Sequence, residues 1–233
     1  MTDAVERHVE PGSAVWWTAH RERLARRGPR AGGLTIERIV DEAIALVDAE
    51  GLDALTVRAL TGRLGTSSAT LYRHVAGVDE LAVLVIDRVL GEVELPDPSL
   101  DPRARVVALS VEFRRVLQAH PAIVNGLRSG PLQGPNALRG ASNGLASLLE
   151  SGYEPAIAVT AYLALIDYVL GSVFFDSASP HHGQFSTDHF DVEGSPTSQL
   201  EEHRQLLVDA SSDTVFLAAV NALLDGLSVE STP

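Results

Sequence analysis

The sequence predicts an all-α protein with a small helical domain near the N-terminus and a larger helical domain after it. From Thr35 onward, apolar residues recur at the spacing of a helix with one buried face. No stretch alternates apolar and polar residues for long enough to indicate a strand. The segment Leu95–Pro98 contains two prolines, which cannot extend a helix, so it marks a linker.

Composition narrows the class of protein. The chain has 233 residues, of which 45% are hydrophobic, and it contains no cysteine. Such a chain forms a packed globular protein, and disulfides, zinc fingers and thiol catalysis are excluded. We expect no membrane segment, because no apolar run reaches membrane-spanning length, and the N-terminus lacks a signal-peptide pattern. The expectation is a cytoplasmic protein without a cofactor.

The distribution of charge matters more than its sum. A net charge of −13 argues at first against a nucleic-acid partner. However, residues 91–233 carry 18 acidic residues against 7 arginines, whereas residues 20–75 carry 9 arginines against 7 acidic residues. The acidic part would face away from a phosphate backbone, and the slightly basic part is suited to meet one.

The pattern divides the chain into three parts: an Arg-rich N-terminal extension over residues 1–33, a helix-turn-helix domain over 34–80, and a helical domain over 81–233. The extension is interrupted by Gly and Pro, so it is interpreted as a tail. In the last part, helices are predicted near residues 102–119, 136–151, 155–175 and 203–228. A long polar loop is predicted over residues 177–198.

Four short helices are predicted in and just after the N-terminal domain. The first has Thr35 as its N-cap and the second has Thr56. Gly65 follows the second and permits the left-handed backbone that a tight turn needs. The third spans residues 67–75, and the fourth begins near residue 79. The pattern is that of a helix-turn-helix.

The third helix has a polar outer face that burial does not require. Only Leu71 and Val75 face inward, and the other side presents Ser67, Ser68, Thr70, Tyr72, Arg73 and His74. Hydroxyl groups suit phosphates and base edges, and an arginine can donate two hydrogen bonds to guanine. A solvated amphipathic helix is the alternative, but the helix and tight turn before it favour a recognition helix that contacts DNA.

Three stretches carry a resemblance to a known family: residues 39–60 (IVDEAIALVDAEGLDALTVRAL), Leu64-Gly65, and residues 70–75 (TLYRHV). Together they resemble the tetracycline-repressor (TetR) family over residues 35–90. The resemblance implies a repressor that binds a palindromic double-stranded DNA operator as a homodimer. It also implies release from the operator when a small-molecule effector binds the C-terminal domain.

The resemblance assigns DNA contacts to the start of the second helix and to the third helix. The positions are Thr56, Arg58, Ser67, Ser68, Ala69, Thr70, Tyr72, Arg73 and His74. One position departs from the family, because Val78 stands where a phosphate-binding Lys is usual.

The Arg-rich extension offers a second basic surface. Arg26, Arg27 and Arg30 precede the first predicted helix and would reach the minor groove or the DNA backbone. A solvated tail is the alternative. Trp16 and Trp17 lie in the same extension, and we expect them to pack onto the domain rather than to stack on bases.

The C-terminal part resembles the tetracycline-repressor subclass more weakly, at residues 113–121, 134–138 and 168–171. The residues that hold tetracycline and Mg²⁺ in that subclass find no match, because Glu94, Leu127, Gly144 and Phe175 occupy their positions. The ligand is therefore not carried over. Residues suited to line an effector site, or else to be ordinary core, are Phe113, Leu117, Asn143, Tyr162, Asp167 and Phe174.

Dimerisation is expected from two segments that are apolar on more than one face, residues 156–175 and 214–227. A partner subunit would cover the faces that the chain itself leaves open, and Gly171 would allow a close approach.

Two other classes of protein are weighed against a DNA-binding regulator. A metal-dependent enzyme would use the polar loop, which contains His181, His182, Asp188, His189 and Asp191. No metal site is predicted, because loop histidines are usually solvated and no His-Glu-x-x-His motif is present. A helical interaction protein that binds no DNA is the other alternative.

Overall fold

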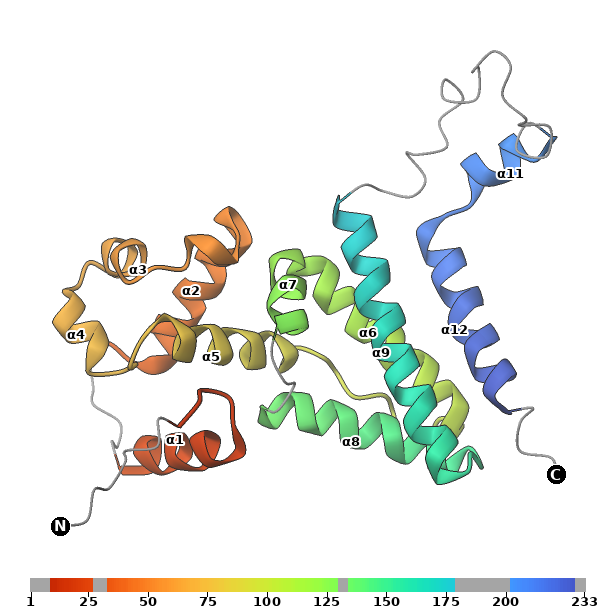
Figure 1. Ribbon diagram of the computed structural model, residues 1–233, viewed down its shortest axis with the longest axis horizontal. Coiled ribbons are helices and arrows are strands. Elements are labelled where there is room, and N and C mark those ends of the chain that lie inside the picture. The colour runs from red at the N-terminus through yellow and green to blue at the C-terminus, as the bar shows by residue number, and fades with distance from the viewer. Residues whose placement is uncertain (1–8, 27–32, 130–133, 179–201, 229–233) are drawn as a thin grey trace, which may run out of the picture. The chain divides into compact units, whose positions relative to one another are not determined.

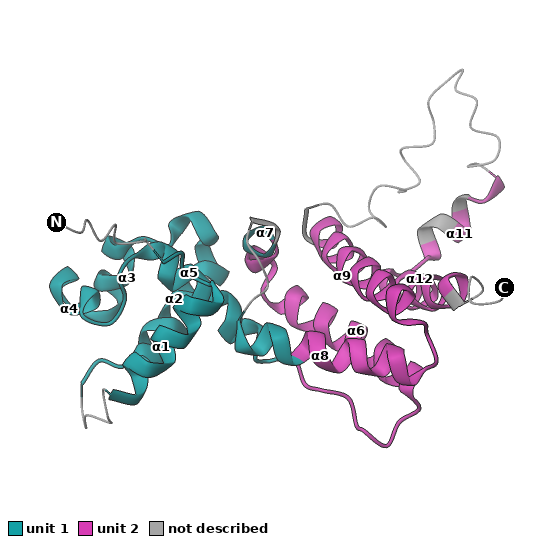
Figure 2. Cartoon of the chain, turned by 60° about the horizontal axis from the view of Figure 1, so that its bottom comes forward, with its two compact units in different colours: residues 1–92, 125–139 teal, residues 93–124, 140–233 magenta. Residues whose placement is uncertain are grey.

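The computed structural model describes residues 9–26, 33–129, 134–178 and 202–228 (Figure 1). Within these ranges all regular structure is helical, as the sequence predicts. The chain forms two compact units, residues 1–92 with 125–139 and residues 93–124 with 140–233 (Figure 2). Helices α7 (Pro121–Ser129) and α8 (Pro135–Glu150) each contribute residues to both units.

Unit 1 contains the four predicted helices, with one further helix before them. Its elements are α1 (Ala14–Arg26), α2 (Ile36–Glu50), the 3-10 helix η1 (Leu52–Ala54), α3 (Val57–Leu64), α4 (Ser68–Tyr72) and α5 (Val78–Leu90). Helix α2 packs against α3 and α5. Its inner face is the apolar stripe that the sequence predicts, with Ile39, Ala43 and Val47 fully buried.

Helix α1 corrects the interpretation of the N-terminal extension as a tail, which is wrong for residues 14–26. The expectation that Trp16 and Trp17 pack onto the domain is confirmed, because only 6% and 8% of these side chains are exposed. The sequence pattern does not reveal this helix, because its buried face is aromatic and short, and Gly and Pro surround it.

Unit 2 is built on three long helices that pack on one another: α6 (Pro102–Ala119), α9 (Pro155–Ala178) and α12 (Ser212–Ser228). The segment expected over 203–228 is in fact two helices, because α11 (Arg204–Asp209) ends before α12 begins. Helix α7 was not predicted. It begins with a proline, which suits the first turn of a helix.

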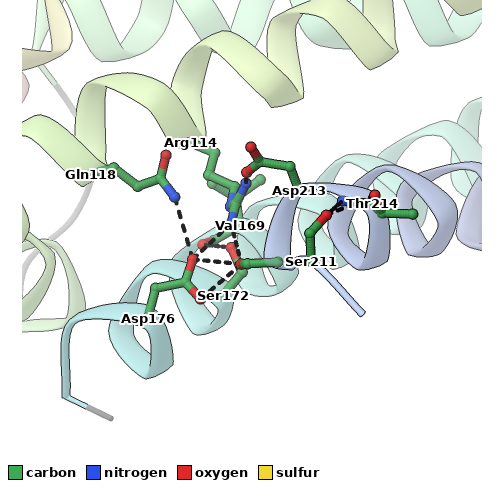
Figure 3. Close-up of polar contacts among 9 residues, drawn as sticks. Arg114, Gln118, Val169, Ser172, Asp176, Ser211, Asp213 and Thr214 are labelled. Carbon is green, nitrogen blue, oxygen red and sulfur yellow. Dashed lines mark hydrogen bonds and ion pairs between the residues drawn. The ribbon is translucent and has the colours of Figure 1, made fainter. Parts of the chain in front are cut away.

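At one end of these helices, Arg114 of α6 joins the last turns of α9 to the first turn of α12 (Figure 3). Its guanidinium donates to Asp213 Oδ1 at 2.6 Å and to Asp176 Oδ2 at 2.7 Å. It also lies over the ring of Phe216, 4.6 Å from the centroid. Burial raises the pKa of Asp176, but hydrogen bonds from Ser212 and Arg114 outweigh it and lower that pKa overall.

The expectation that no apolar run reaches membrane-spanning length is wrong for helix α9. Residues Pro155–Asp176 have a mean hydropathy of 1.8 and are long and apolar enough to cross a membrane by length and composition alone. The core helix of a water-soluble bundle passes the same test, and α9 packs against α6 and α12. Its apolar residues extend around the whole helix, so a large part of them stays uncovered in a single chain.

Candidate functional site

The candidate DNA-contacting site is formed by α3, the turn after it and α4. The hydroxyl of Thr56 accepts a hydrogen bond from the Ala59 amide at 3.2 Å and so caps α3. Gly65 has φ 61° and ψ 37°, the left-handed conformation that the sequence predicts for the turn. Ser67 then caps α4 by accepting from the Thr70 amide at 3.2 Å. Local sequence thus sets both helix starts and the turn between them.

The polar face of α4 forms its own hydrogen-bond network. Ser67 Oγ lies 3.0 Å from Thr70 Oγ1, and Arg73 Nη2 donates to the same Thr70 oxygen at 3.0 Å. These hydroxyl groups and the guanidinium are therefore arranged side by side on one surface. Hydroxyl and guanidinium groups at such a surface can donate to phosphate oxygens and to base edges.

Most of the predicted DNA-contacting residues lie at the surface of unit 1. Exposed are Thr56, Arg58, Ser67, Ser68, Ala69, Tyr72 and Arg73, while Thr70 and His74 are half-buried. Tyr72 is 54% exposed although it is a large aromatic residue. Of the three arginines of the N-terminal extension, Arg26 is exposed, and its Nη2 lies 3.4 Å from Glu22 Oε2. Arg27 and Arg30 lie outside the described residues.

Two buried acidic residues of α5, Glu80 and Asp87, were not recognised from the sequence. Both contact backbone amides, at Ala76 and Asn136 respectively. The only sequence signal for Glu80 is its place in the first turn of a helix, where Glu often reaches back to a free amide. No signal in the sequence marks Asp87, because its partners lie 49 and 50 residues further along the chain.

The residues proposed to line an effector site all belong to unit 2 and lie on α6, α8 and α9. Leu117 is fully buried, and Phe113, Asn143, Tyr162 and Phe174 are half-buried. Asp167 is exposed, so the expectation that it faces an interior site is not met in a single chain. The sequence points to Asp167 because it interrupts the apolar run of residues 156–175, but a helix that is apolar all round gives no sign of which side faces inward.

Helix α8 carries two unpaired polar atoms, one of them on Asn143, a residue of this set. Asn143 Oδ1 and Ser147 Oγ are buried on the same face of α8, and neither has a hydrogen-bond partner among the described residues. Gly144 lies between them, and a Cβ added there would be 3.3 Å from Leu109 and 3.5 Å from Tyr162. Burial raises the pKa of Tyr162. Buried polar atoms without partners are rare in proteins, so this place has spare hydrogen-bonding capacity.

The residues considered for a metal site, His181, His182, Asp188, His189 and Asp191, lie outside the described residues. In the described part of the chain, no three His, Asp or Glu side chains come together as a metal site would require.

Unit 1 has the features of a helix-turn-helix protein: a capped helix, a left-handed glycine turn and a second helix with an exposed polar face. Comparison with known proteins agrees. Residues 39–82 match the profile of the bacterial regulatory proteins of the tetR family, and residues 95–230 match the tetracyclin repressor-like C-terminal domain. The chain belongs to the TetR family of bacterial transcriptional regulators. It is therefore a DNA-binding regulator, and the enzyme alternative is set aside.

Named relatives include two HTH-type transcriptional regulators. An HTH-type transcriptional regulator of Saccharopolyspora erythraea is 36% identical over 178 residues, which are 76% of this chain and 73% of the relative. The HTH-type transcriptional repressor DrrR1 of Streptomyces coeruleorubidus is 34% identical over 160 residues, which are 68% of this chain and 58% of that protein.

Solved structures show the same fold. ActR of Streptomyces coelicolor, a TetR family protein crystallised with (S)-DNPA, superposes with a TM-score of 0.73 at 29% identity. The match covers 85% of this chain and 98% of ActR. ActR in complex with actinorhodin gives the same TM-score at 28% identity.

Proposed function

We propose that the protein is a cytoplasmic repressor that binds a palindromic DNA operator as a homodimer and is released by a small-molecule effector. The observation that carries the proposal is the exposed polar face of α4, which follows a capped α3 and a left-handed turn. DNA contacts are assigned to Thr56, Arg58, Ser67, Ser68, Ala69, Thr70, Tyr72, Arg73 and His74. Contacts with the minor groove or the DNA backbone are assigned to Arg26 and, from the sequence alone, to Arg27 and Arg30, which lie outside the described residues.

The uncovered apolar surface of α9 and α12 supports the homodimer. Val159 and Leu163 lie one turn apart on α9 and are 46% and 54% exposed. On α12, Val215 and Leu217 are 47% and 44% exposed. Large apolar patches at the surface of one chain mark association sites. A two-fold dimer formed here would present two copies of α4 to successive major grooves, about one helical turn of DNA apart.

The unpaired polar atoms of α8 support an effector site inside unit 2. The site is assigned to Phe113, Leu117, Asn143, Tyr162 and Phe174, with Ser147 added from its burial and missing partner. Apolar walls with a few polar groups are typical of small-molecule sites. The capture of actinorhodin by ActR shows that a relative of this fold takes a small molecule. Effector binding would favour a state of the dimer in which the two α4 helices no longer fit the operator.

Selection of bound sequences from a random pool of double-stranded DNA tests the proposal. The full-length chain is expected to enrich a palindrome with half-sites about 10 base pairs apart. Affinity for that sequence is expected to fall steeply with salt, because phosphate contacts release counterions. Arg73→Ala is expected to relax the preferred base at one position of each half-site. If no sequence is enriched at low salt, the proposal is wrong.

A further inference from the structure

Glu80 is a buried carboxylate directly behind the recognition helix. It lies in the first turn of α5, and only 2% of the residue is exposed. A buried charge is costly unless hydrogen bonds and opposite charges compensate it. Burial alone would raise the pKa of Glu80, but the neighbouring His20 ring, the hydrogen bond from the Ala76 amide and the charge of Arg23 lower it. The side chain is therefore a paired, ionised group at neutral pH.

The two oxygens of this carboxylate contact two different parts of unit 1. Oε2 accepts a hydrogen bond from the backbone amide of Ala76 at 2.6 Å. Oε1 accepts from Arg23 Nη2 on α1 at 2.7 Å, and His20 Nδ1 lies 3.6 Å from the same oxygen. One carboxylate thus joins α1 to the turn between α4 and α5, across 57 residues of sequence.

Helix α1 also carries a cluster of three ring side chains. His20 stacks on Trp16 with ring centroids 4.9 Å apart, and Trp17 meets both rings edge-on. All three side chains are buried. Just before the helix, a Cβ added at Gly12 would lie 3.3 Å from Val83 of α5. Because the buried rings and the close approach of Gly12 to Val83 place α1 against the rest of unit 1, Arg23 meets Glu80 from a packed helix.

The turn that Glu80 holds is the end of the recognition helix. His74 and Val75 donate backbone hydrogen bonds to Leu71 of α4, and Ala76 is the next residue. Fixing the Ala76 amide therefore fixes the direction in which the chain leaves α4. At Val78, two residues later, this chain has no basic side chain with which DNA could hold the turn from outside.

We propose that α1 is a brace for the recognition helix, in which Arg23 and Glu80 are positioning residues for operator binding. The proposal rests on the proposed function, since it takes α4 as the DNA-contacting helix. A surface that is preorganised in the free protein loses less entropy on binding, so a loosened turn would weaken the complex without removing any contact to DNA.

The experiment compares Arg23→Met with Arg21→Met, its matched control. Methionine keeps much of the apolar stem and removes the charge. Arg21 is exposed, lies on the same helix and stands outside the Glu80 network. With the operator from the selection, Arg23→Met is expected to bind about threefold to tenfold more weakly, the effect of one half-exposed charged hydrogen bond. The slope of log affinity against log salt is expected to stay unchanged, and Arg23→Lys is expected to recover most of the affinity.

Hydrogen exchange of the Ala76 amide in the free protein provides a second readout. Exchange is expected to speed up in Arg23→Met and in Glu80→Gln but not in Arg21→Met. The double variant of Arg23 and Glu80 is expected to bind no more weakly than the weaker single variant, because both changes break one link. A thermal melt of each variant shows whether it remains folded.

Three results would overturn the brace. The first is an operator affinity of Arg23→Met that equals that of the wild type. The second is a salt slope that is lower by about one in Arg23→Met, which would make Arg23 a phosphate contact. The third is unchanged exchange at Ala76 in a folded Arg23→Met. If the wild-type chain enriches no DNA, the proposed function fails, and the exchange at Ala76 still decides whether α1 holds the turn.

Discussion

Asp87 of α5 caps Asn136 of α8: the Asp87 Oδ1 accepts a hydrogen bond from the Asn136 backbone amide at 3.0 Å. The second oxygen accepts from Asn136 Nδ2, also at 3.0 Å. Burial raises the pKa of Asp87 despite these hydrogen bonds. A carboxylate from one helix therefore supplies the N-cap that α8 does not find in its own sequence, where Gly134 precedes Pro135.

Removing this carboxylate is expected to destabilise the protein. Asp87→Ala leaves the Asn136 backbone amide without its acceptor and removes one of the two acceptors of Asn136 Nδ2, which keeps only the Asp87 backbone carbonyl. Such a loss costs about 1–3 kcal/mol. Denaturant unfolding would measure it. Asp79→Ala is the control, because Asp79 is an exposed acidic residue at the other end of α5, and its loss is expected to stay within about 0.5 kcal/mol. Equal stability of the two variants would contradict the capping role.

Gly134 gives a sharper form of the same test. A Cβ added at Gly134 would overlap the Asp87 carboxylate. Gly134→Ala is therefore expected to be destabilising in the wild-type chain and less so in the Asp87→Ala background. The coupling free energy of the double-mutant cycle is expected to exceed about 0.5 kcal/mol. An additive pair would show that the two residues do not share one space.

Sequence patterns predict those structural features that neighbouring residues determine. They do not predict features that depend on contacts between residues far apart in the chain. Thr35, Thr56, Ser67 and Gly65 act on their own neighbours, so the helix starts and the tight turn follow from the sequence. Helix α1 is stabilised partly through Glu80, which lies 57 residues beyond Arg23. Nothing near α1 in the sequence indicates that partner, and the helix was missed.

The candidate sites, too, could be predicted only where neighbouring residues determine them. The polar face of α4 could be predicted because a helix of known period displays it. Asp167 could not be placed, because α9 is apolar all round and either side of it could face inward. Ser147 was overlooked because a serine in a helix usually bonds a carbonyl one turn earlier, and only the structure shows that this one does not.

Acid is expected to weaken the junction of α6, α9 and α12 through Asp176. Its folded-state pKa lies below the ordinary value of 3.8, so its contribution to stability is complete above that value and is lost as pH falls through it. The difference in unfolding free energy between wild type and Asp176→Asn should be constant above about pH 5 and shrink below about pH 4. Urea unfolding over this range measures it. A difference that is the same at pH 6 and pH 3 would count against the ion pair with Arg114.

A charge placed on the exposed apolar face of α9 is expected to prevent formation of the proposed dimer. Leu163→Glu would put a carboxylate into the proposed interface, where an unpaired charge costs several kcal/mol. Sedimentation at micromolar concentration should then show a monomer, and operator affinity should fall with it. Leu100→Glu is the control, since Leu100 is 42% exposed but lies in the segment before α6. A Leu163→Glu variant that stays dimeric would move the interface away from this face.

Substitution of Ser147 tests whether its buried hydroxyl serves effector binding or the stability of the fold. Its hydroxyl is fully buried and has no partner among the described residues, so Ser147→Ala is expected to leave the free protein as stable or to stabilise it by about 1 kcal/mol. Ser151→Ala, one turn later, removes a hydroxyl that donates to the Ser147 carbonyl at 2.7 Å and is expected to lower stability slightly. Thermal unfolding compares the two. Release from the operator by a small molecule found to act on the wild type is the second readout, and Ser147→Ala should need a higher concentration of that molecule than wild type. A Ser147→Ala variant that is clearly less stable, with an unchanged response, would show that the hydroxyl serves the fold and not the effector.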